Sequence, residues 1–119
     1  MEVASIILRT ADVDRSTAFW SERVGLEVAG QVPGFTFLNG GSISIVLSAI
    51  DSVTDESLTE VVFGSEDVRE TYQTLADRGV PFEADLRTIM SRDGRDLLGA
   101  HFRDPDGHYG TLTGWVNSD

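Results

Sequence analysis

The feature that most constrains this chain is a pattern of apolar, capping and glycine residues that occurs twice. Asp12-Val13 begins a helical pattern that ends at Gly25, and Asp67-Val68 begins a second one that ends at Gly79. Aspartate accepts hydrogen bonds from the free amides at the start of a helix, and glycine commonly ends one. Each pattern follows a run with strand character, so the sequence predicts two similar halves that each begin with a strand and a helix.

Three further strands are expected after each helix. The first set covers 26–32, 35–38 and 42–48, and the second covers 82–90, 97–102 and 109–116. The turn sequences between them are Pro33-Gly34, Asn39-Gly40, Asp93-Gly94 and Asp104-Pro105-Asp106-Gly107. The sequence therefore predicts a single α+β domain over 1–119, made of two tandem βαβββ modules at about 1–50 and 57–119 with a linker at about 49–58. The modules should form a curved mixed sheet around one cleft, with the helices on its outer face.

The composition narrows the classes of partner and of chemistry. The formal charge is −11, from 20 acidic and 9 basic residues, which disfavours nucleic acids and anionic membranes and attracts cationic molecules. The chain has no cysteine and its basic residues are all arginine, so thiolate chemistry and lysine Schiff bases are excluded. The first eight residues lack the basic leader of a signal sequence, and we expect a cytoplasmic protein.

Several motifs carry a family resemblance. The segment from Asp12 to Ser16, followed by Phe19-Trp20 and by Val24-Gly25-Leu26, resembles the first-helix signature of the vicinal oxygen chelate superfamily. This superfamily includes glyoxalase I, bleomycin resistance proteins and extradiol dioxygenases. The segment Phe102 to His108 resembles its closing motif. The combined match extends over nearly the whole chain and implies the fold predicted above.

The resemblance also implies where a metal would bind. Metal-dependent members place strong ligands on the first strand, on the strand that opens the second module and on the last strand, and these positions are Ser5, Glu60 and Thr111 here. One carboxylate with two hydroxyl groups is a poor donor set for zinc, nickel or iron. We therefore predict no metal and no cofactor, and a protein closest in character to the metal-free bleomycin resistance branch.

Two titratable residues leave alternatives open. His101 shares a strand face with Arg103, and it is either a cleft residue able to donate and accept protons or a histidine at the rim with no specific role. Glu60 is either a base or cation-binding group in the cleft, or a carboxylate neutralised by Arg9. His108, which leaves a turn, is read as structural.

Aromatic side chains give the clearest sequence indication of ligand binding. Phe35 and Phe37 share one strand face, and Tyr109 and Trp115 share the face of Thr111, so these faces are able to stack a planar ligand. Packing in the core beneath the helices is the alternative, above all for Phe35 and Phe37. The predicted ligand-binding residues are Ser5, Phe35, Phe37, Glu60, His101, Tyr109, Thr111 and Trp115.

Three functions of different classes follow. The first is a metal-free binding protein of the antibiotic resistance type, which sequesters a drug-like or secondary metabolite ligand that is planar and cationic. The second is a glyoxalase- or dioxygenase-like enzyme, a lyase or an oxidoreductase, with a non-standard site around Glu60 and His101. The third is a non-catalytic accessory subunit. A homodimer is expected, because the family commonly pairs its chains and a short open sheet leaves edges to cover.

Overall fold

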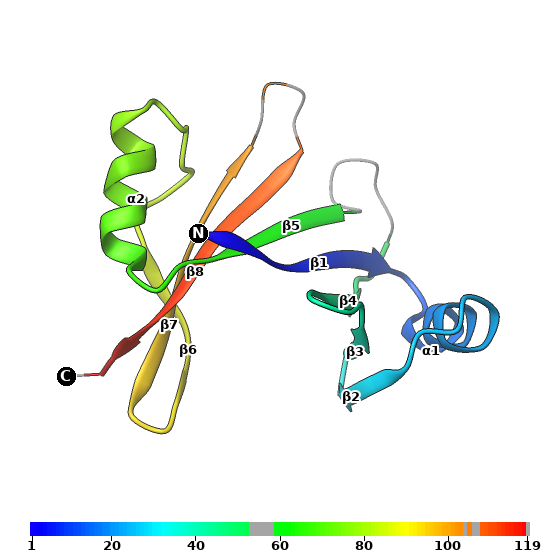
Figure 1. The fold of residues 1–119 in the computed structure, drawn as a ribbon. Helices are drawn as coiled ribbons and strands as arrows, with labels where there is room; N and C mark the ends of the chain where they lie inside the picture. The colour runs from blue at the N-terminus through cyan, green and yellow to red at the C-terminus, as the bar shows by residue number, and fades with distance from the viewer. Residues whose placement is uncertain (53–58, 104, 106–107, 119) are drawn as a thin grey trace. The chain divides into compact units, whose positions relative to one another are not determined.

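The computed structural model describes residues 1–52, 59–103, 105 and 108–118 (Figure 1). Within them the chain forms eight strands, two α-helices and one π-helical turn. The first half contains β1 (Glu2–Thr10), α1 (Val13–Ala18), the π-helical turn η1 (Phe19–Arg23), β2 (Val28–Val32), β3 (Phe35–Asn39) and β4 (Ser44–Ala49). The second contains β5 (Thr59–Gly64), α2 (Val68–Asp77), β6 (Arg87–Arg92), β7 (Arg95–Arg103) and β8 (Tyr109–Asn117). The predicted α+β fold with two βαβββ segments is confirmed.

The chain forms two compact units, residues 4–61 and residues 1–3 with 62–119. The boundary between these units lies inside β5. The linker predicted at about 49–58 stays a prediction. Positions 53–58 of that linker, and positions 104, 106 and 107 of the predicted Asp-Pro-Asp-Gly turn, lie outside the described residues.

In the unit of residues 4–61 the strand order is β2-β3-β4-β1. The pairs β2–β3 and β3–β4 are antiparallel and β1–β4 is parallel, so the sheet is mixed. Helix α1 packs on β3 and β4, where Thr36, Leu38 and Leu47 are buried. The Thr17 hydroxyl on α1 lies 2.9 Å from that of Thr36, which places the even-numbered positions of β3 under the helix.

The first helix begins as predicted but changes its winding. The Asp12 carboxylate accepts a hydrogen bond from the Arg15 amide at 3.0 Å, and Gly25 has a φ of 95°, the left-handed conformation that glycine adopts most easily. Between these ends the α-helix gives way after Ala18 to the π-helical turn η1. The Val24 amide accordingly donates to the Phe19 carbonyl, five residues earlier.

In the second unit the strand order is β5-β8-β7-β6, and helix α2 covers one face of β7 and β8. The core beneath α2 is formed by Val68, Leu98 and Leu112, with Phe63, Tyr72, Leu75, Phe82, Leu86 and Val116 packed around it. Gly114 lets the helix approach, because a Cβ at this position would lie 2.4 Å from Cβ of Val68. The Asp67 carboxylate caps α2 through the Glu70 amide at 3.2 Å.

One predicted strand is wrong at its start. We expected a strand over 82–90, but β6 runs from Arg87 to Arg92, and Phe82 forms only an isolated bridge to Phe102. Phe82 instead packs its ring 4.5 Å from that of Tyr72 and 5.5 Å from that of Phe102. Burial under α2 therefore takes this segment away from the sheet. Neither α-helix in the described residues has the length and apolar character that a membrane span requires.

Candidate functional site

In residues 4–61 the predicted site residues of β1 and β3 share the sheet face that points away from α1. We call this surface the Phe35 face. The registers of β1, β3 and β4 align three residues of each strand on it, namely Ser5, Ile7, Arg9, Phe35, Phe37, Asn39, Ser44, Val46 and Ser48. Phe35 and Phe37 are 43% and 37% exposed, so they do not belong to the core beneath α1. The alternative of core packing beneath the helices is therefore wrong for these two rings, and their role in ligand binding stays a prediction.

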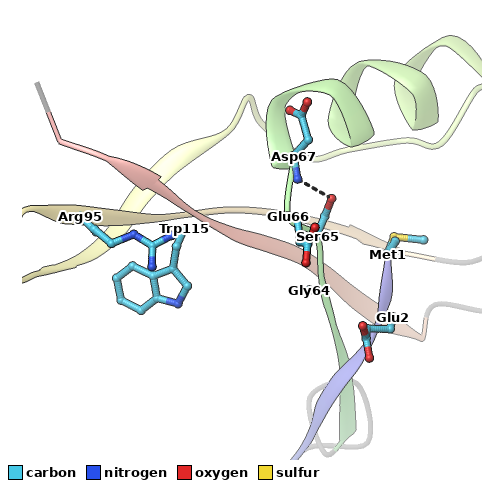
Figure 2. Close-up of a pocket in the computed structure, with 8 residues that line it drawn as sticks. All are labelled: Met1, Glu2, Gly64, Ser65, Glu66, Asp67, Arg95 and Trp115. Atoms are coloured by element: carbon cyan, nitrogen blue, oxygen red, sulfur yellow. Dashed lines mark hydrogen bonds between the residues drawn. The ribbon is translucent and has the colours of Figure 1, made fainter.

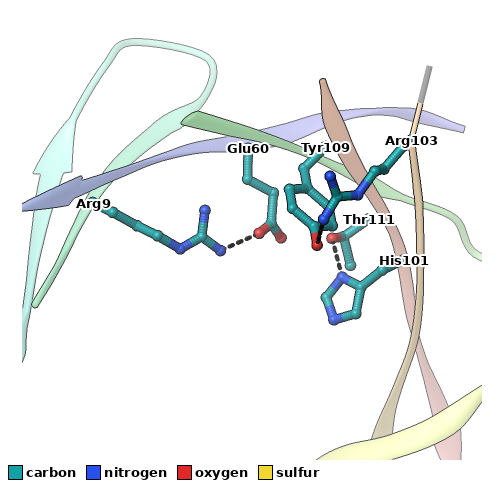
Figure 3. Close-up of polar contacts among 6 residues, drawn as sticks. All are labelled: Arg9, Glu60, His101, Arg103, Tyr109 and Thr111. Carbon is teal, nitrogen blue, oxygen red and sulfur yellow. Dashed lines mark hydrogen bonds and ion pairs between the residues drawn. The ribbon is translucent and has the colours of Figure 1, made fainter. Parts of the chain in front are cut away.

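Glu60 on β5 is a buried carboxylate with only 4% of its surface exposed. The Arg9 guanidinium donates a hydrogen bond to its Oε1 (Figure 3). The alternative of a carboxylate neutralised by Arg9 is thus the one found. A paired charge is far less costly to bury than a lone one, which explains how the strand accommodates it.

In the second unit the registers of β6, β7 and β8 define the surface that points away from α2, which we call the Arg103 face. Its members are Arg87, Met90, Arg92, Arg95, Leu97, Gly99, His101, Arg103, Tyr109, Thr111, Thr113, Trp115 and Asn117. The sequence prediction that Tyr109, Thr111 and Trp115 share one face, and that His101 shares one with Arg103, agrees with these registers. Ile89, in the bulge of β6, lies over Gly99, where a Cβ would meet Ile89 Cδ1 at 2.1 Å.

His101 and Thr111 face each other across β7 and β8. The Nδ1 atom of His101 lies 2.6 Å from the Thr111 hydroxyl oxygen, and Thr111 is only 2% exposed. Figure 3 shows this contact beside the pair formed by Arg103 and Tyr109. The bond fixes the orientation of the imidazole ring through Nδ1, and Nε2 is the ring nitrogen left for other chemistry.

Arg103 is held by three contacts that the sequence reasoning did not predict. Its guanidinium donates through Nη2 to the Tyr109 hydroxyl and through Nε to Glu83 at 3.2 Å, and it lies 4.2 Å from the centre of the Tyr109 ring. The hydrogen bond to Tyr109 raises the pKa of Arg103 further. The contact between Arg103 and Tyr109 depends on the register between β7 and β8, and a single sequence does not determine this register.

Trp115 lines a hollow of about 530 Å³ in the second unit (Figure 2). The other lining residues are Met1, Glu2, Gly64, Ser65, Glu66, Asp67 and Arg95. The Arg95 guanidinium lies 5.8 Å from the centre of the indole ring, a cation–π arrangement. The Asp67 carboxylate is engaged in capping α2, and the Asp67 amide donates to the Ser65 hydroxyl at 3.3 Å. Trp115 thus lines this hollow, and its role in ligand binding stays a prediction.

The three positions at which the family resemblance implies a metal do not suit one. Ser5 and Thr111 offer hydroxyl oxygens, and the carboxylate of Glu60 is bonded to the cation of Arg9. A guanidinium beside the carboxylate repels a metal ion and competes for its strongest donor. Across residues 1–52, 59–103, 105 and 108–118, no three histidine or acidic side chains form a group able to hold a metal. We therefore assign no step to a metal.

Comparison with known proteins places the chain in a family. The sequence matches the Glyoxalase/Bleomycin resistance protein/Dioxygenase superfamily over residues 2–109. No curated protein matches it. A superfamily member from Vibrio splendidus 12B01 superposes with a TM-score of 0.76 at 17% identity, over 94% of this chain and 97% of that one. A hypothetical protein from Bacillus halodurans C-125 gives 0.75 at 16% identity, over 99% and 96%.

A third solved structure is an enzyme. Methylmalonyl-CoA epimerase from Streptomyces coelicolor, in complex with 2-nitronate-propionyl-CoA, superposes with a TM-score of 0.68 at 18% identity, over 96% of each chain. Structural similarity at 18% sequence identity shows a shared fold only, and it does not show that this chain catalyses the same reaction. The match over residues 2–109, together with the two βαβββ segments, shows that the chain belongs to the glyoxalase/bleomycin resistance protein/dioxygenase superfamily.

Proposed function

We propose that the protein is a metal-free binding protein that sequesters a small planar organic molecule, in the manner of the bleomycin resistance branch of its superfamily. The observation that carries this proposal is the exposure of Phe35 and Phe37, which are 43% and 37% exposed while the other side of the same strand is buried under α1. Exposed apolar side chains gathered on one face of a small protein commonly mark a binding surface. Flat rings on a sheet give a planar ligand a large contact area.

The residues at the three positions where the family resemblance implies metal ligands support a binding function over metal catalysis. Ser5, Glu60 and Thr111 supply one carboxylate, and it is already paired with Arg9. A ligand on such a surface is recognised by shape, stacking and hydrogen bonds, none of which needs a reactive group. The pair also removes Glu60 as the recognition group for a cationic ligand, so the ligand's charge has to be argued from other residues.

Calorimetric titration with a panel of planar aromatic compounds tests the proposal. We expect saturable binding of one or more of them, weakened about fivefold by Phe35→Ala or Phe37→Ala, because each ring contributes on the order of 1 kcal/mol through stacking. Phe19→Ala is the matched control, since Phe19 is 53% exposed but lies on η1. Absence of binding across the panel, or equal weakening in the control, would contradict the proposal.

A second candidate is a proton-transfer enzyme, and the contact between His101 and Thr111 favours it. A ring oriented through Nδ1 presents Nε2 as a base, provided a substrate carbon lies within reach. The test incubates the protein with methylmalonyl-CoA in deuterated water and follows exchange at the α-carbon by NMR. Exchange that His101→Ala abolishes would establish the enzyme. Neither exchange nor ligand binding would favour the third candidate, an accessory subunit.

We further propose that the protein forms a homodimer. The proposal is based on two edge strands, each of which has only one hydrogen-bonded neighbouring strand among the described residues. These are β2, with Val28 and Val32 exposed, and β6, with Ile89 and Met90 exposed. Exposed apolar edge strands favour pairing with a second chain. Sedimentation velocity should give twice the 13.0 kDa mass of the chain, and a single monomeric species at micromolar concentration would contradict the proposal.

A further inference from the structure

The second unit concentrates positive charge on the Arg103 face, although the chain as a whole has a net charge of −11. Four of the nine arginines lie on this face, together with His101, and they are Arg87, Arg92, Arg95 and Arg103. None of the positions that β6, β7 and β8 contribute to the face is an aspartate or a glutamate. Asp96, the acidic residue within β7, lies on the opposite face, where it binds Ser91 and Ser118. The charged residues that β6, β7 and β8 contribute to this face are therefore opposite in sign to the net charge of the chain.

The cationic groups cluster at one part of the face. Arg103 and His101 are two residues apart on β7, so their side chains are neighbours on the same side. Arg87 lies opposite Gly99 on the adjacent strand, which makes it a diagonal neighbour of His101, at about 7–8 Å between backbones. Gly99 between them has no side chain of its own, and the side chain of Ile89 covers it, with Cδ1 2.1 Å from where a Gly99 Cβ would be. Two guanidinium groups and an imidazole thus surround a short stretch of sheet.

The contacts of Arg103 prepare it to bind an anion. The Tyr109 hydroxyl and the Tyr109 ring fix the plane of the guanidinium, which reduces the entropy lost when a ligand binds. Glu83 already accepts from Nε, so a carboxylate is a geometrically suitable partner here. That ion pair is exposed, with 39% of the Arg103 side chain and 46% of the Glu83 side chain accessible, and pairs of this kind are weak. A ligand carboxylate can therefore bind beside Glu83 or replace it.

We propose that the Arg103 face binds the carboxylate of an anionic small molecule, with Arg103 and Arg87 as charged donors, His101 as a hydrogen-bond partner and Tyr109 as a stacking surface. This inference goes beyond the proposed function, because the Arg103 face belongs to the other unit from the Phe35 face and is argued as a second binding surface. The charge of its ligand is opposite to the charge expected from composition. The distant acidic residues do not prevent it, because at physiological salt their field decays over about 8 Å. Charge-assisted hydrogen bonds at contact distance are stronger than that residual field.

Three compounds with the same ring system test the inference: 2-naphthoate, 2-naphthamide and 2-naphthylmethylamine in its protonated form. We expect the carboxylate to bind about tenfold or more tightly than the amide, and the amine to bind most weakly, as measured by calorimetry on the full chain. Arg103→Gln should reduce the affinity for the carboxylate to about that for the amide. Arg78→Gln, on the exposed end of α2, is the matched control and should change neither.

The outcomes separate this inference from the proposed function. If the amide or the amine binds as tightly as the carboxylate, the proposed function stands and the charge assignment is overturned. If none of the three compounds binds, the inference on the Arg103 face is overturned, and the wider panel of planar compounds decides the proposed function. Arg87→Gln serves as a second variant in case Arg103→Gln disturbs Tyr109, because Arg87 is exposed and should lower the affinity for the carboxylate about threefold to tenfold. An unchanged affinity in both variants also overturns the assignment.

Discussion

Arg9 on β1 donates a hydrogen bond to the carboxylate of Glu60 on β5, within the unit of residues 4–61. The side chains of the two residues are 21% and 5% exposed, so the pair is largely shielded from water. The carboxylate that the family resemblance assigns to a metal is thereby used inside the chain. Because this pair uses the one carboxylate among the three implied metal positions, the described residues offer no adequate set of metal ligands there.

Removing the cation of this pair should destabilise the fold. We expect Arg9→Met to lower the free energy of unfolding by about 3 kcal/mol, because it removes the compensating charge from a buried carboxylate. The double variant Arg9→Met with Glu60→Leu should recover part of the loss, since it removes both charges. Urea denaturation monitored by circular dichroism measures all three proteins. Arg15→Met, at an exposed position of α1, is the control. If Arg9→Met lowers the free energy of unfolding as little as Arg15→Met does, the pair contributes little to stability.

A second prediction concerns the carboxylate of Asp96. Hydrogen bonds from the hydroxyls of Ser91 at 2.6 Å and Ser118 at 2.7 Å hold the pKa of Asp96 below its ordinary value of 3.8. A lowered pKa in the folded state gives stability that is present above the ordinary pKa and is lost as the pH falls through the folded value. The melting temperature should therefore decrease below about pH 4.

The variant Asp96→Asn isolates this contribution. It should melt at a lower temperature than the wild type at about pH 7 and should show a shallower decrease in acid. Ser118→Ala should have an intermediate effect, because it removes one of the two donors. Scanning calorimetry across the acid range measures the slopes. Equal slopes in wild type and Asp96→Asn would mean that the two serine bonds do not act on the titration of Asp96.

Tyr72 provides a prediction at the alkaline end. Burial, and then the hydrogen bond that its hydroxyl donates to Asp85 at 3.0 Å, raise the pKa of Tyr72 above its ordinary value of 10.0. The neutral phenol is thus favoured by folding, and this stability is lost as the pH rises through the folded value. Phenolate absorbance should show one tyrosine that titrates late, and Tyr72→Phe should remove that step. Its persistence in Tyr72→Phe would contradict the prediction.

The order of elements was predictable because local rules decide it. Asp12 and Asp67 cap their helices, and Gly25 and Gly79 adopt φ values of 95° and 91°, as residues that end a helix commonly do. The predicted turn at Asp93-Gly94 joins β6 to β7, with positive φ angles of 53° and 76°. In each case the residue type and its immediate neighbours determine the conformation.

The candidate site was predictable only in part, because it depends on which face a helix covers. The alternation of side chains along a strand predicts that Phe35 and Phe37 lie on the same face of the sheet. Only the packing of α1 on Thr36 shows that this face is the one pointing away from α1. The Arg103 face required the register between β6, β7 and β8, and one sequence does not contain it. The π-helical turn after Ala18 likewise gave no sequence signal that distinguishes it from a continuing α-helix.

Gly114 should be the glycine of the second unit that tolerates a side chain least. A Cβ there would lie 2.4 Å from Cβ of Val68 and 2.6 Å from the Ser65 carbonyl oxygen, and neither atom belongs to the flexible end of a side chain. We expect Gly114→Ala to lower the free energy of unfolding by about 2–3 kcal/mol, since α2 must move away from β8. The matched control is Gly30→Ala on β2, where nothing lies within 4 Å of the added carbon. Alanine should be neutral or slightly stabilising at Gly30, because it restricts the unfolded chain. If both variants unfold at the same denaturant concentration as the wild type, the close packing of α2 on β8 is not what holds the second unit together.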